Sequence, residues 1–425
     1  MASGGAIMVP AGRPWRLVAA WLVCGLAVVV YAARLALVIA AGGDPSHPAF
    51  DLAIYLQAAA HLRAGLSVYQ TQVDIARSGW PYVYPPLLAE LLLPFPSYAA
   101  AWWAWTALSL ACWLGSLGLL LWELRARVWD PLPAEWRPVL VAGLVLWPAV
   151  LLDVLVGQIQ LPLLALLCGS WWALGPRRAP GRASAGGAGR WAMAGLLLGL
   201  AMALKPLPAT ALVSLLAARH GRVAGLAAVA AGVVMLVSFA FVGLDQLGVY
   251  VLQAGPGLAH AMARNPNSGT LAMSLSLLVG SGVVPDWLAL AVDLAVLGAT
   301  ALAAWRWRPA GRPALALGVS CGLLVSPILE SHHLVLVYLP LLQALGDATP
   351  RQRPVVGALA AALVGSSFVL GTPADPPLVL GLKSALTVGV LLALFVVQIC
   401  QARTAALAEQ RALSGGRTRG RGGRG

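Results

Sequence analysis

Long apolar stretches, separated by short polar ones, follow one another along almost the whole chain. A straight helix needs roughly 17–25 apolar residues to cross a bilayer, and stretches of about this length recur throughout. The pattern predicts an all-α polytopic membrane protein with about twelve transmembrane or membrane-embedded helices. We place them near residues 15–41, 86–123 (interrupted by Pro94 and Pro96), 138–152, 157–175, 191–204, 206–218, 223–243, 286–305, 313–329, 332–346, 354–371 and 377–401.

Two neighbouring stretches, 191–204 and 206–218, are each too short to cross the membrane. The apolar layer is about 30 Å thick, and a helix rises about 1.5 Å per residue. We therefore expect a hairpin that turns at Lys205 and Pro206 before it emerges fully. Protein or a water-filled cavity must then cover the turn, because lipid cannot satisfy exposed backbone groups.

The composition agrees with a membrane protein, since 60% of the residues are hydrophobic and only 10% are charged. The net charge is +13, and the basic residues gather in short loops between apolar runs and in the tail. Such loops usually face the cytoplasm, so both termini are predicted to be cytoplasmic, and nucleic acid is not an expected partner. Residues 1–401 are interpreted as a single transmembrane domain in the cell membrane, and 402–425 as a disordered basic tail.

Two long loops, 42–85 and 244–285, then lie on the extracytoplasmic side. The first contains "HPAFDLAIYLQAAAHLRAGLSVY", in which Pro48 suits a first helical turn and Gly65 a stop. Asp51 and Tyr55 share one face of this segment, which predicts a short helix lying on the membrane surface. The second loop contains another short apolar stretch after "HAMARNPNSGT".

Polar side chains concentrate on this same side of the predicted topology. Ionisable groups at membrane depth are costly and usually functional. We therefore expect one extracytoplasmic pocket lined by charges of both signs, formed by the two long loops and the nearby helix ends. Its candidate residues are Asp51, Tyr55, Tyr82, Tyr84, Asp153, Gln158, Gln160, Lys205, His260, Arg264, Asn265, Asn267, Ser268, Glu330, His332 and His333.

The residue types in this set suit a phosphate-bearing substrate. Lys205, Arg264 and one of the paired histidines are cations or potential cations that bind phosphate oxygens. Asp51 is a candidate base. The chain contains no glycine-rich phosphate loop and no carboxylate pair after the first span, and its five cysteines have no metal-ligand spacing. We therefore expect neither a cofactor nor a catalytic metal ion.

Several blocks resemble glycosyltransferase family 87, whose members are membrane enzymes of the GT-C class. "FDLAIYLQAAAHLRAGLSVY" and "WPYVYPPLLAELLLPF" follow the first span, and later blocks occur in the family's order: "GQIQLPLLALL", "ALKPLPATALVSLLAAR", "NPNSGTLAM" and "SPILESHHLVLVYLP". The resemblance covers most of residues 15–345. It implies an inverting transfer of a sugar, expected to be mannose, from a polyprenyl-phosphate donor to a glycolipid or cell-envelope glycan.

The resemblance also implies roles for particular residues. Asp51 falls at the position of the catalytic base. Lys205, His332 and His333 fall at the positions that hold the donor phosphate, to which Arg264 is added as a further cation. Substrate contacts are expected from Tyr55, Tyr82, Tyr84, Asp153, Gln158, Asn265, Asn267 and Glu330. The family often has Trp before the histidine pair, where this chain reads "LESHH", so Glu330 is expected to alter the acceptor contacts.

Other interpretations of these residues stay open at this point. Asp51 also suits a solvated loop, and Lys205 a side chain that reaches the lipid headgroups. Only one of His332 and His333 is expected to face the pocket, because adjacent helical residues diverge by about 100°. A transporter or flippase for lipid-linked sugars and a non-catalytic scaffold for envelope assembly are the alternative functions. Membrane lipids are expected partners in each case.

Overall fold

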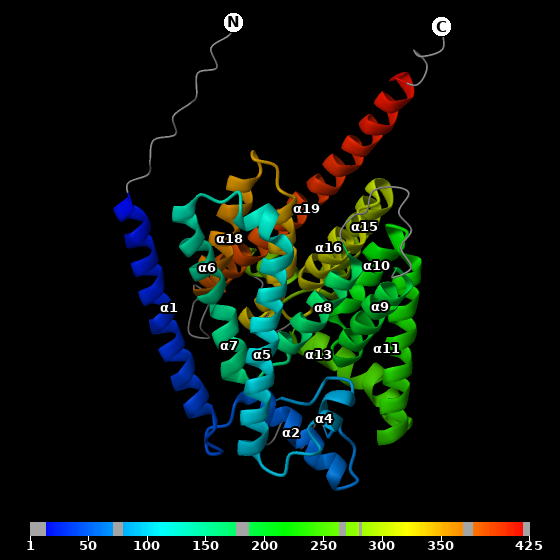
Figure 1. Cartoon of the computed structure of the whole chain (residues 1–425). Helices are drawn as coiled ribbons and strands as arrows, with labels where there is room; N and C mark the ends of the chain where they lie inside the picture. The colour runs from blue at the N-terminus through cyan, green and yellow to red at the C-terminus, as the bar shows by residue number, and fades with distance from the viewer. Residues whose placement is uncertain are drawn as a thin grey trace, which may run out of the picture.

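The computed structural model describes residues 14–70, 80–175, 187–262, 269–279, 283–368 and 377–419. Most of these residues are helical, and no β-strand occurs among them, which confirms the all-α fold (Figure 1). The α-helices are α1 (Pro14–Gly42), α2 (Phe50–Arg63), α4 (Leu87–Leu91), α5 (Tyr98–Leu124), α6 (Arg137–Val145), α7 (Pro148–Val156), α8 (Gln160–Leu174), α9 (Gly187–Leu204), α10 (Thr210–Ala217), α11 (Gly221–Val242), α12 (Asp245–Val249), α13 (Gly255–Met262), α14 (Leu271–Leu278), α15 (Asp286–Trp307), α16 (Gly311–Leu324), α17 (Tyr338–Asp347), α18 (Arg353–Phe368) and α19 (Pro377–Arg419). Short 3-10 or π-helical segments are η1 (Arg125–Trp129), η2 (Ala134–Trp136), η3 (Leu207–Ala209), η4 (Tyr250–Ala254) and η6 (Ser331–Val337).

Six helices of the described chain are long and apolar enough to cross a membrane, which makes the protein a multi-pass membrane protein. Five further apolar helices are shorter, so about half of the twelve predicted helices reach a full spanning length. The full-length candidates are Leu17–Gly42, Tyr98–Trp129, Ala134–Val156, Gly221–Val242, Asp286–Trp307 and Leu382–Arg411.

The bundle has two distinct ends (Figure 1). The helices α2 and α4 lie at one of them, which we call the α2 end. At the other, which we call the basic end, α1 begins and α19 ends. The loop around His220 meets the loop after α15 there, since His220 Nε2 lies 3.0 Å from the Pro309 carbonyl oxygen.

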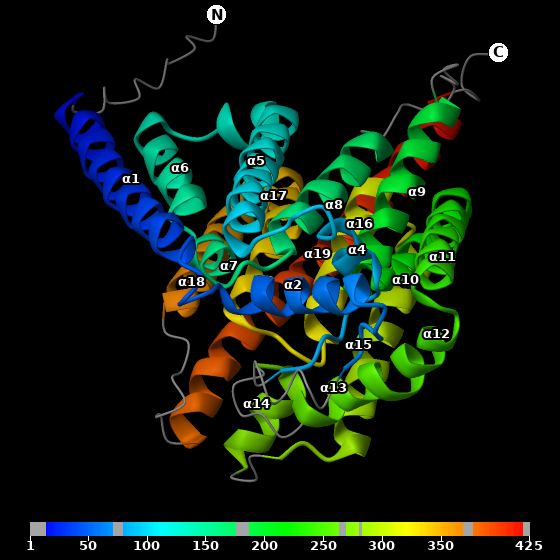
Figure 2. The same cartoon turned by 90° about the horizontal axis from the view of Figure 1, so that it is seen from below.

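Helix α2 lies across the end of the bundle, as the view from below shows (Figure 2). It packs its Leu52, Tyr55 and Ala59 side chains inward, each of them fully buried. The helix approaches closely because Gly157 lies beneath it: a Cβ added there would stand 2.7 Å from the Leu52 Cβ. Gly157 also has a positive φ of 72°, a conformation that favours glycine. The short helix predicted between Pro48 and Gly65 is thus present.

Helix α16 occupies the centre, where every residue from Ala314 to Leu324 is buried. Two of its glycines allow α10 to pack against its backbone. A Cβ at Gly318 would lie 2.4 Å from the Ala211 Cα, and one at Gly322 would lie 2.6 Å from the Thr210 Oγ1. Small residues are common where membrane helices meet this closely. This contact fixes the turn between α9 and α10, which begins at Lys205.

The breaks in the apolar pattern correct several predicted boundaries. The stretch 86–123 becomes the short α4 and the long α5, and the Ser97 hydroxyl caps α5 by accepting a bond from the Ala100 amide at 3.3 Å. The stretch 332–346 begins as the 3-10 segment η6 and only then becomes α17. Helix α19 continues to Arg419, so the first part of the tail predicted to be disordered, 402–425, is helical.

Candidate active site

A cavity of about 640 Å³ lies at the α2 end, where segments distant in sequence converge. Its walls come from α2, the loop after residue 80, the turn between α7 and α8, the turn after α9, and the segment that leads from α16 into η6. Its polar and charged lining residues include Asp51, Tyr84, Gln158, Lys205, Thr210, Ser326, Glu330, Ser331, His332 and His333. Asp51, Lys205, Glu330, His332 and His333, all in the predicted set, therefore meet around one cavity.

The cationic side of the cavity is formed by Lys205, which is only 8% exposed. Helix α9 ends one residue before it, so the side chain leaves the bundle at the predicted break. Its Nζ lies 3.0 Å from the His333 Nε2 and 5.3 Å from the centre of the Tyr84 ring. Burial lowers the pKa of Lys205 to about 8, while the carboxylates of Asp51 and Glu330 act in the opposite direction. Lys205 thus points into the cavity and not towards lipid headgroups.

The paired histidines are held by the first turn of η6. The Glu330 backbone N–H donates to the His333 Nδ1 at 3.2 Å, and the Glu330 side chain accepts from the His333 backbone N–H. The His332 Nε2 lies 3.4 Å from a Glu330 carboxylate oxygen, and the two imidazole rings are 4.4 Å apart. Both histidines line the cavity, so the expectation that only one would face it is wrong. The reason is that both rings turn towards Glu330.

The hydrogen bonds of His333 constrain its proton. Because Nδ1 accepts from the Glu330 N–H, the neutral ring must carry its proton on Nε2, which faces Lys205. If Lys205 is uncharged, this N–H can donate to its amine nitrogen. If Lys205 is protonated, both groups are donors and neither can accept from the other. The pair is therefore better satisfied once an anion arrives to accept from a charged Lys205.

Asp51 stands in the first turn of α2 and lines the same cavity. It contacts Gln158, whose side chain is fixed by two tyrosines: the Tyr55 hydroxyl donates to its Oε1 at 2.5 Å, and its Nε2 donates to the Tyr84 oxygen at 3.2 Å. Burial and, to a smaller extent, Glu330 raise the pKa of Asp51 to about 7, against the lowering effect of Lys205 and of the Gln158 hydrogen bond. A carboxyl group with this pKa suits proton transfer near neutral pH.

Three residues expected to contact substrate lie behind the cavity wall instead. Tyr55 and Asp153 are completely buried, and Tyr82 is 1% exposed with its hydroxyl donating to the Pro85 carbonyl at 2.6 Å. None of them lines the cavity. Tyr55 still acts on the site from behind the wall, because its hydroxyl fixes the Gln158 side chain.

Arg264, Asn265 and Asn267 lie outside the described residues. The cavity also has lining residues that the sequence did not single out, among them Trp80 and Tyr250. Trp80 is the first residue of the "WPYVYPPLLAELLLPF" block, although it was not among the candidate site residues. Tyr250 comes from η4 in the second long loop, and an isolated tyrosine in a polar loop carries no signal of its own.

Glu330, His332 and His333 also form a possible metal-binding group, since one ligand atom of each lies within 4.8 Å of the others. The two ring nitrogens of His333, however, already face the Glu330 N–H and the Lys205 Nζ. Only Glu330 and His332 then offer free ligand atoms, and Lys205 lies beside them. A resident divalent cation therefore fits this group poorly.

The fold and the cavity together define a multi-pass membrane protein with a charged site at one end of its bundle. The chain belongs to glycosyltransferase family 87, whose sequence model matches residues 82–327, and it is a membrane glycosyltransferase. It is also similar to the polyprenol-phosphate-mannose-dependent alpha-(1-2)-phosphatidylinositol mannoside mannosyltransferase of Mycobacterium tuberculosis. The two are 30% identical over 391 residues, which cover 84% of this chain and 82% of that protein. No solved structure matches the chain.

Proposed function

We propose that this protein transfers mannose from a polyprenyl-phosphate donor to a hydroxyl of a glycolipid or cell-envelope glycan, with inversion at the anomeric carbon. The observation that carries the proposal is the convergence of Asp51, Lys205 and His333 on one cavity of about 640 Å³. The mannosyltransferase from Mycobacterium tuberculosis is named for a polyprenol-phosphate-mannose donor and a phosphatidylinositol mannoside acceptor, which supports a donor and an acceptor of these kinds.

In the proposed reaction, Asp51 takes the proton from the acceptor hydroxyl. The resulting oxygen nucleophile attacks C1 of the sugar, and the bond between C1 and the phosphate oxygen breaks on the opposite face. The electron pair leaves with the polyprenyl phosphate, which needs no general acid because phosphate is a good leaving group. A general base of this kind contributes about 10²–10⁴-fold to a rate.

The donor phosphate would be held by Lys205, His332 and His333, with Arg264 as a further candidate. Lys205 is the cation best placed for this, because its Nζ and the His333 Nε2 are 3.0 Å apart and both face the cavity. Negative charge that develops on the leaving phosphate is stabilised most strongly where water is excluded, as it is around a side chain that is 8% exposed.

The acceptor would enter on the side of Asp51, where Gln158 and Tyr84 line the cavity, with Asn265 and Asn267 as further candidates. Glu330 also lines it and can accept a bond from an acceptor hydroxyl. We place the cavity on the extracytoplasmic side and both termini in the cytoplasm, because the basic loops gather at the other end of the bundle.

The test is transfer by the purified full chain in lipid nanodiscs, given polyprenyl-phosphate-mannose and a panel of envelope glycolipids, with products identified by mass spectrometry. Asp51→Asn should lower the rate about 10³-fold and leave donor binding intact. Asp286→Asn, the same change at an exposed position at the start of α15, is the matched control and should keep full activity. Full activity of Asp51→Asn, or movement of the intact donor across the membrane without transfer, would overturn the proposal.

A further inference from the structure

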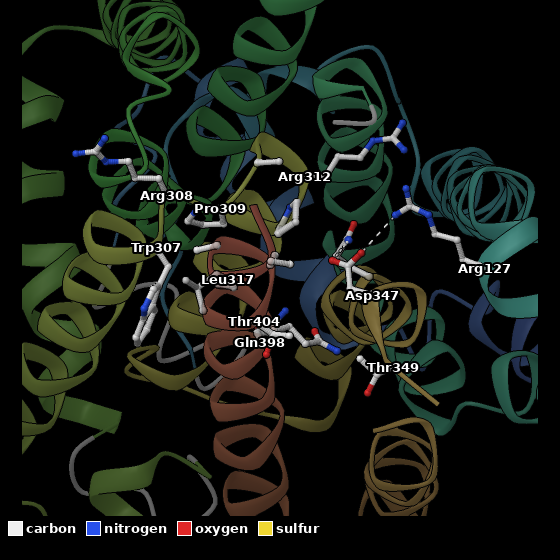
Figure 3. Close-up of a pocket in the computed structure, with 18 of the residues that line it drawn as sticks. Arg127, Trp307, Arg308, Pro309, Arg312, Leu317, Asp347, Thr349, Gln398 and Thr404 are labelled. Carbon is white, nitrogen blue, oxygen red and sulfur yellow. Dashed lines mark hydrogen bonds and ion pairs between the residues drawn. The ribbon is translucent and has the colours of Figure 1, made fainter. Parts of the chain in front are cut away.

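A second cavity, of about 490 Å³, lies at the basic end of the bundle (Figure 3). It is bounded by the last turns of α5 and α8, the turn between α15 and α16, the end of α17, and α19. Nothing in the proposed transfer uses these residues. The cavity has polar and apolar walls, the apolar part including Leu124, Trp171, Trp307, Leu317 and several alanines of α19.

Most charged groups around this cavity are paired with one another. The Arg312 guanidinium lies 2.8 Å from a Glu123 carboxylate oxygen, donates to the Trp171 carbonyl at 3.1 Å, and stacks 4.0 Å from the Trp171 ring centre. On the opposite wall Arg127 lies 3.3 Å from Asp347, whose other oxygen accepts from the Gln343 amide at 2.6 Å (Figure 3). These contacts hold the walls in place and pair most of the charged groups with one another.

Two polar groups of the lining residues have no hydrogen-bond or ion-pair partner among the described residues. Gln398 is only 7% exposed, and its Oε1 has no hydrogen-bond partner within the described chain, although its Nε2 lies 3.4 Å from the Pro340 carbonyl. Arg308 ends α15 at the rim, and its side chain forms no ion pair or hydrogen bond with any residue that the structure describes. Both residues line the cavity, Gln398 at its buried wall and Arg308 at its exposed rim.

Exposed tryptophans indicate that the basic end of the bundle lies near a membrane interface. Exposed tryptophans surround this end of the bundle: Trp122, Trp136 and Trp305 are 68%, 56% and 58% exposed. Exposed tryptophans of a membrane protein gather at the membrane interface. The lining contains three arginines (Arg127, Arg308 and Arg312) and two carboxylates (Glu123 and Asp347), which leaves one net positive charge. Basic pockets between helices at this depth are typical sites for anionic lipid headgroups.

We propose that this cavity binds the headgroup of one anionic phospholipid. Arg308 holds the phosphodiester, a headgroup hydroxyl donates to the Gln398 Oε1, and the apolar wall receives the start of the acyl chains. The site binds but does not react, because its other charged groups already neutralise each other. The lipid therefore acts as a bound structural partner at the end of the bundle away from the transferase cavity.

The test uses the full chain in detergent, titrated with phosphatidylglycerol and observed by native mass spectrometry. One phosphatidylglycerol should bind each chain in preference to phosphatidylcholine with the same acyl chains. Arg308→Gln should raise the Kd roughly five-fold, as expected for one basic residue near an anionic headgroup. Gln398→Leu should raise it about five-fold through the lost hydrogen bond, and the two changes together about 25-fold.

Arg306→Gln is the control, because it removes the same charge from an exposed residue that does not line the cavity. The proposal is overturned if Arg306→Gln weakens binding as much as Arg308→Gln, or if both cavity variants bind like the wild type. Equally tight binding of phosphatidylcholine would also overturn it, and so would soluble glycerol phosphate that binds as tightly as the lipid. Asp51→Asn should bind phosphatidylglycerol normally, so the result is independent of the proposed transfer.

Discussion

The two cavities at opposite ends of this bundle differ in how far their polar and charged groups are paired. At the α2 end, the buried His332 Nε2 has no hydrogen-bond partner among the described residues, and its contact with a Glu330 carboxylate oxygen is long, at 3.4 Å. At the basic end, Arg312 pairs with Glu123 at 2.8 Å and Arg127 with Asp347 at 3.3 Å. Most charges at the basic end are thus paired among the described residues, with Arg308 the exception, whereas the His332 Nε2 at the α2 end has no such partner.

We propose that this difference separates groups that serve the reaction from groups that stabilise the fold. A buried polar group without a partner costs about 1–3 kcal/mol, and such groups cluster at functional sites. A buried pair, in contrast, costs most when only one partner is removed. Removing a charge at the α2 end should therefore lower activity, and removing one at the basic end should lower stability.

The largest effect is expected for Lys205→Met, which removes the cation proposed to hold the donor phosphate. The efficiency of transfer, kcat/KM for the donor, should fall about 10³-fold, as it does when an electrostatic group of an enclosed site is lost. Methionine fills similar space without a buried charge, so the apparent Tm should not fall. Transfer assays and thermal unfolding in the same detergent test both parts. If Lys205→Met lowers the Tm and leaves the activity per folded molecule unchanged, Lys205 stabilises the fold and takes no part in transfer.

At the basic end, Arg312→Met should have the opposite outcome. It leaves Glu123 and the carbonyl groups at the end of α8 without their shared donor, a loss of about 3 kcal/mol in the free energy of unfolding. The apparent Tm should fall by roughly 5 °C, whereas binding of the polyprenyl-phosphate sugar donor should not change.

The double variant Glu123→Leu with Arg312→Met provides the control for this prediction. Replacing both members of a buried pair by apolar residues is often neutral, so the double variant should regain part of the lost stability. If the single variant unfolds like the wild type, Arg312 does not hold the walls of the second cavity.

Much of the fold followed from the apolar pattern, because a membrane leaves few alternatives. The short helix at Asp51 and the break at Lys205 were both predicted, and both are present. The number of full-length spans was not predictable in the same way. Packing against α16 allows short helices such as α10 to stay below spanning length, and such contacts are not visible in hydropathy.

The candidate site was found from the scarcity of charge, which makes Asp51, Lys205 and the histidine pair conspicuous. The same reasoning could not tell residues that face the cavity from those behind it, such as Asp153. A shift of one position along a helix is enough to turn a side chain away from the cavity. It also missed the second cavity. Arg312 lies in "RWRPAGR", where any of three arginines would satisfy the charge rule for loops, yet only this one is buried.

The smallest expected effect is the dependence of transfer on pH, which tests the α2 end alone. The proposed base, Asp51, can take a proton only when ionised, so kcat/KM should rise with pH until the pH passes about 7, the pKa of its carboxyl group. Lys205, proposed to hold the donor phosphate, can do so only when protonated, so kcat/KM should fall again above about 8. The profile of the free enzyme is therefore bell-shaped and narrow, with each limb approaching about ten-fold per pH unit.

Lys205→Arg separates the two limbs of that profile. Arginine stays charged throughout this range, so the limb above about 8 should disappear while the limb at about 7 remains. Binding of a polyprenyl phosphate to the wild type near pH 8 should also take up part of a proton, because the anion favours the charged form of Lys205. Calorimetry in buffers of different ionisation enthalpy measures this uptake, and the variant should show none. An upper limb that survives in Lys205→Arg would assign it to another group and leave the Lys205–His333 pair without a part in donor binding.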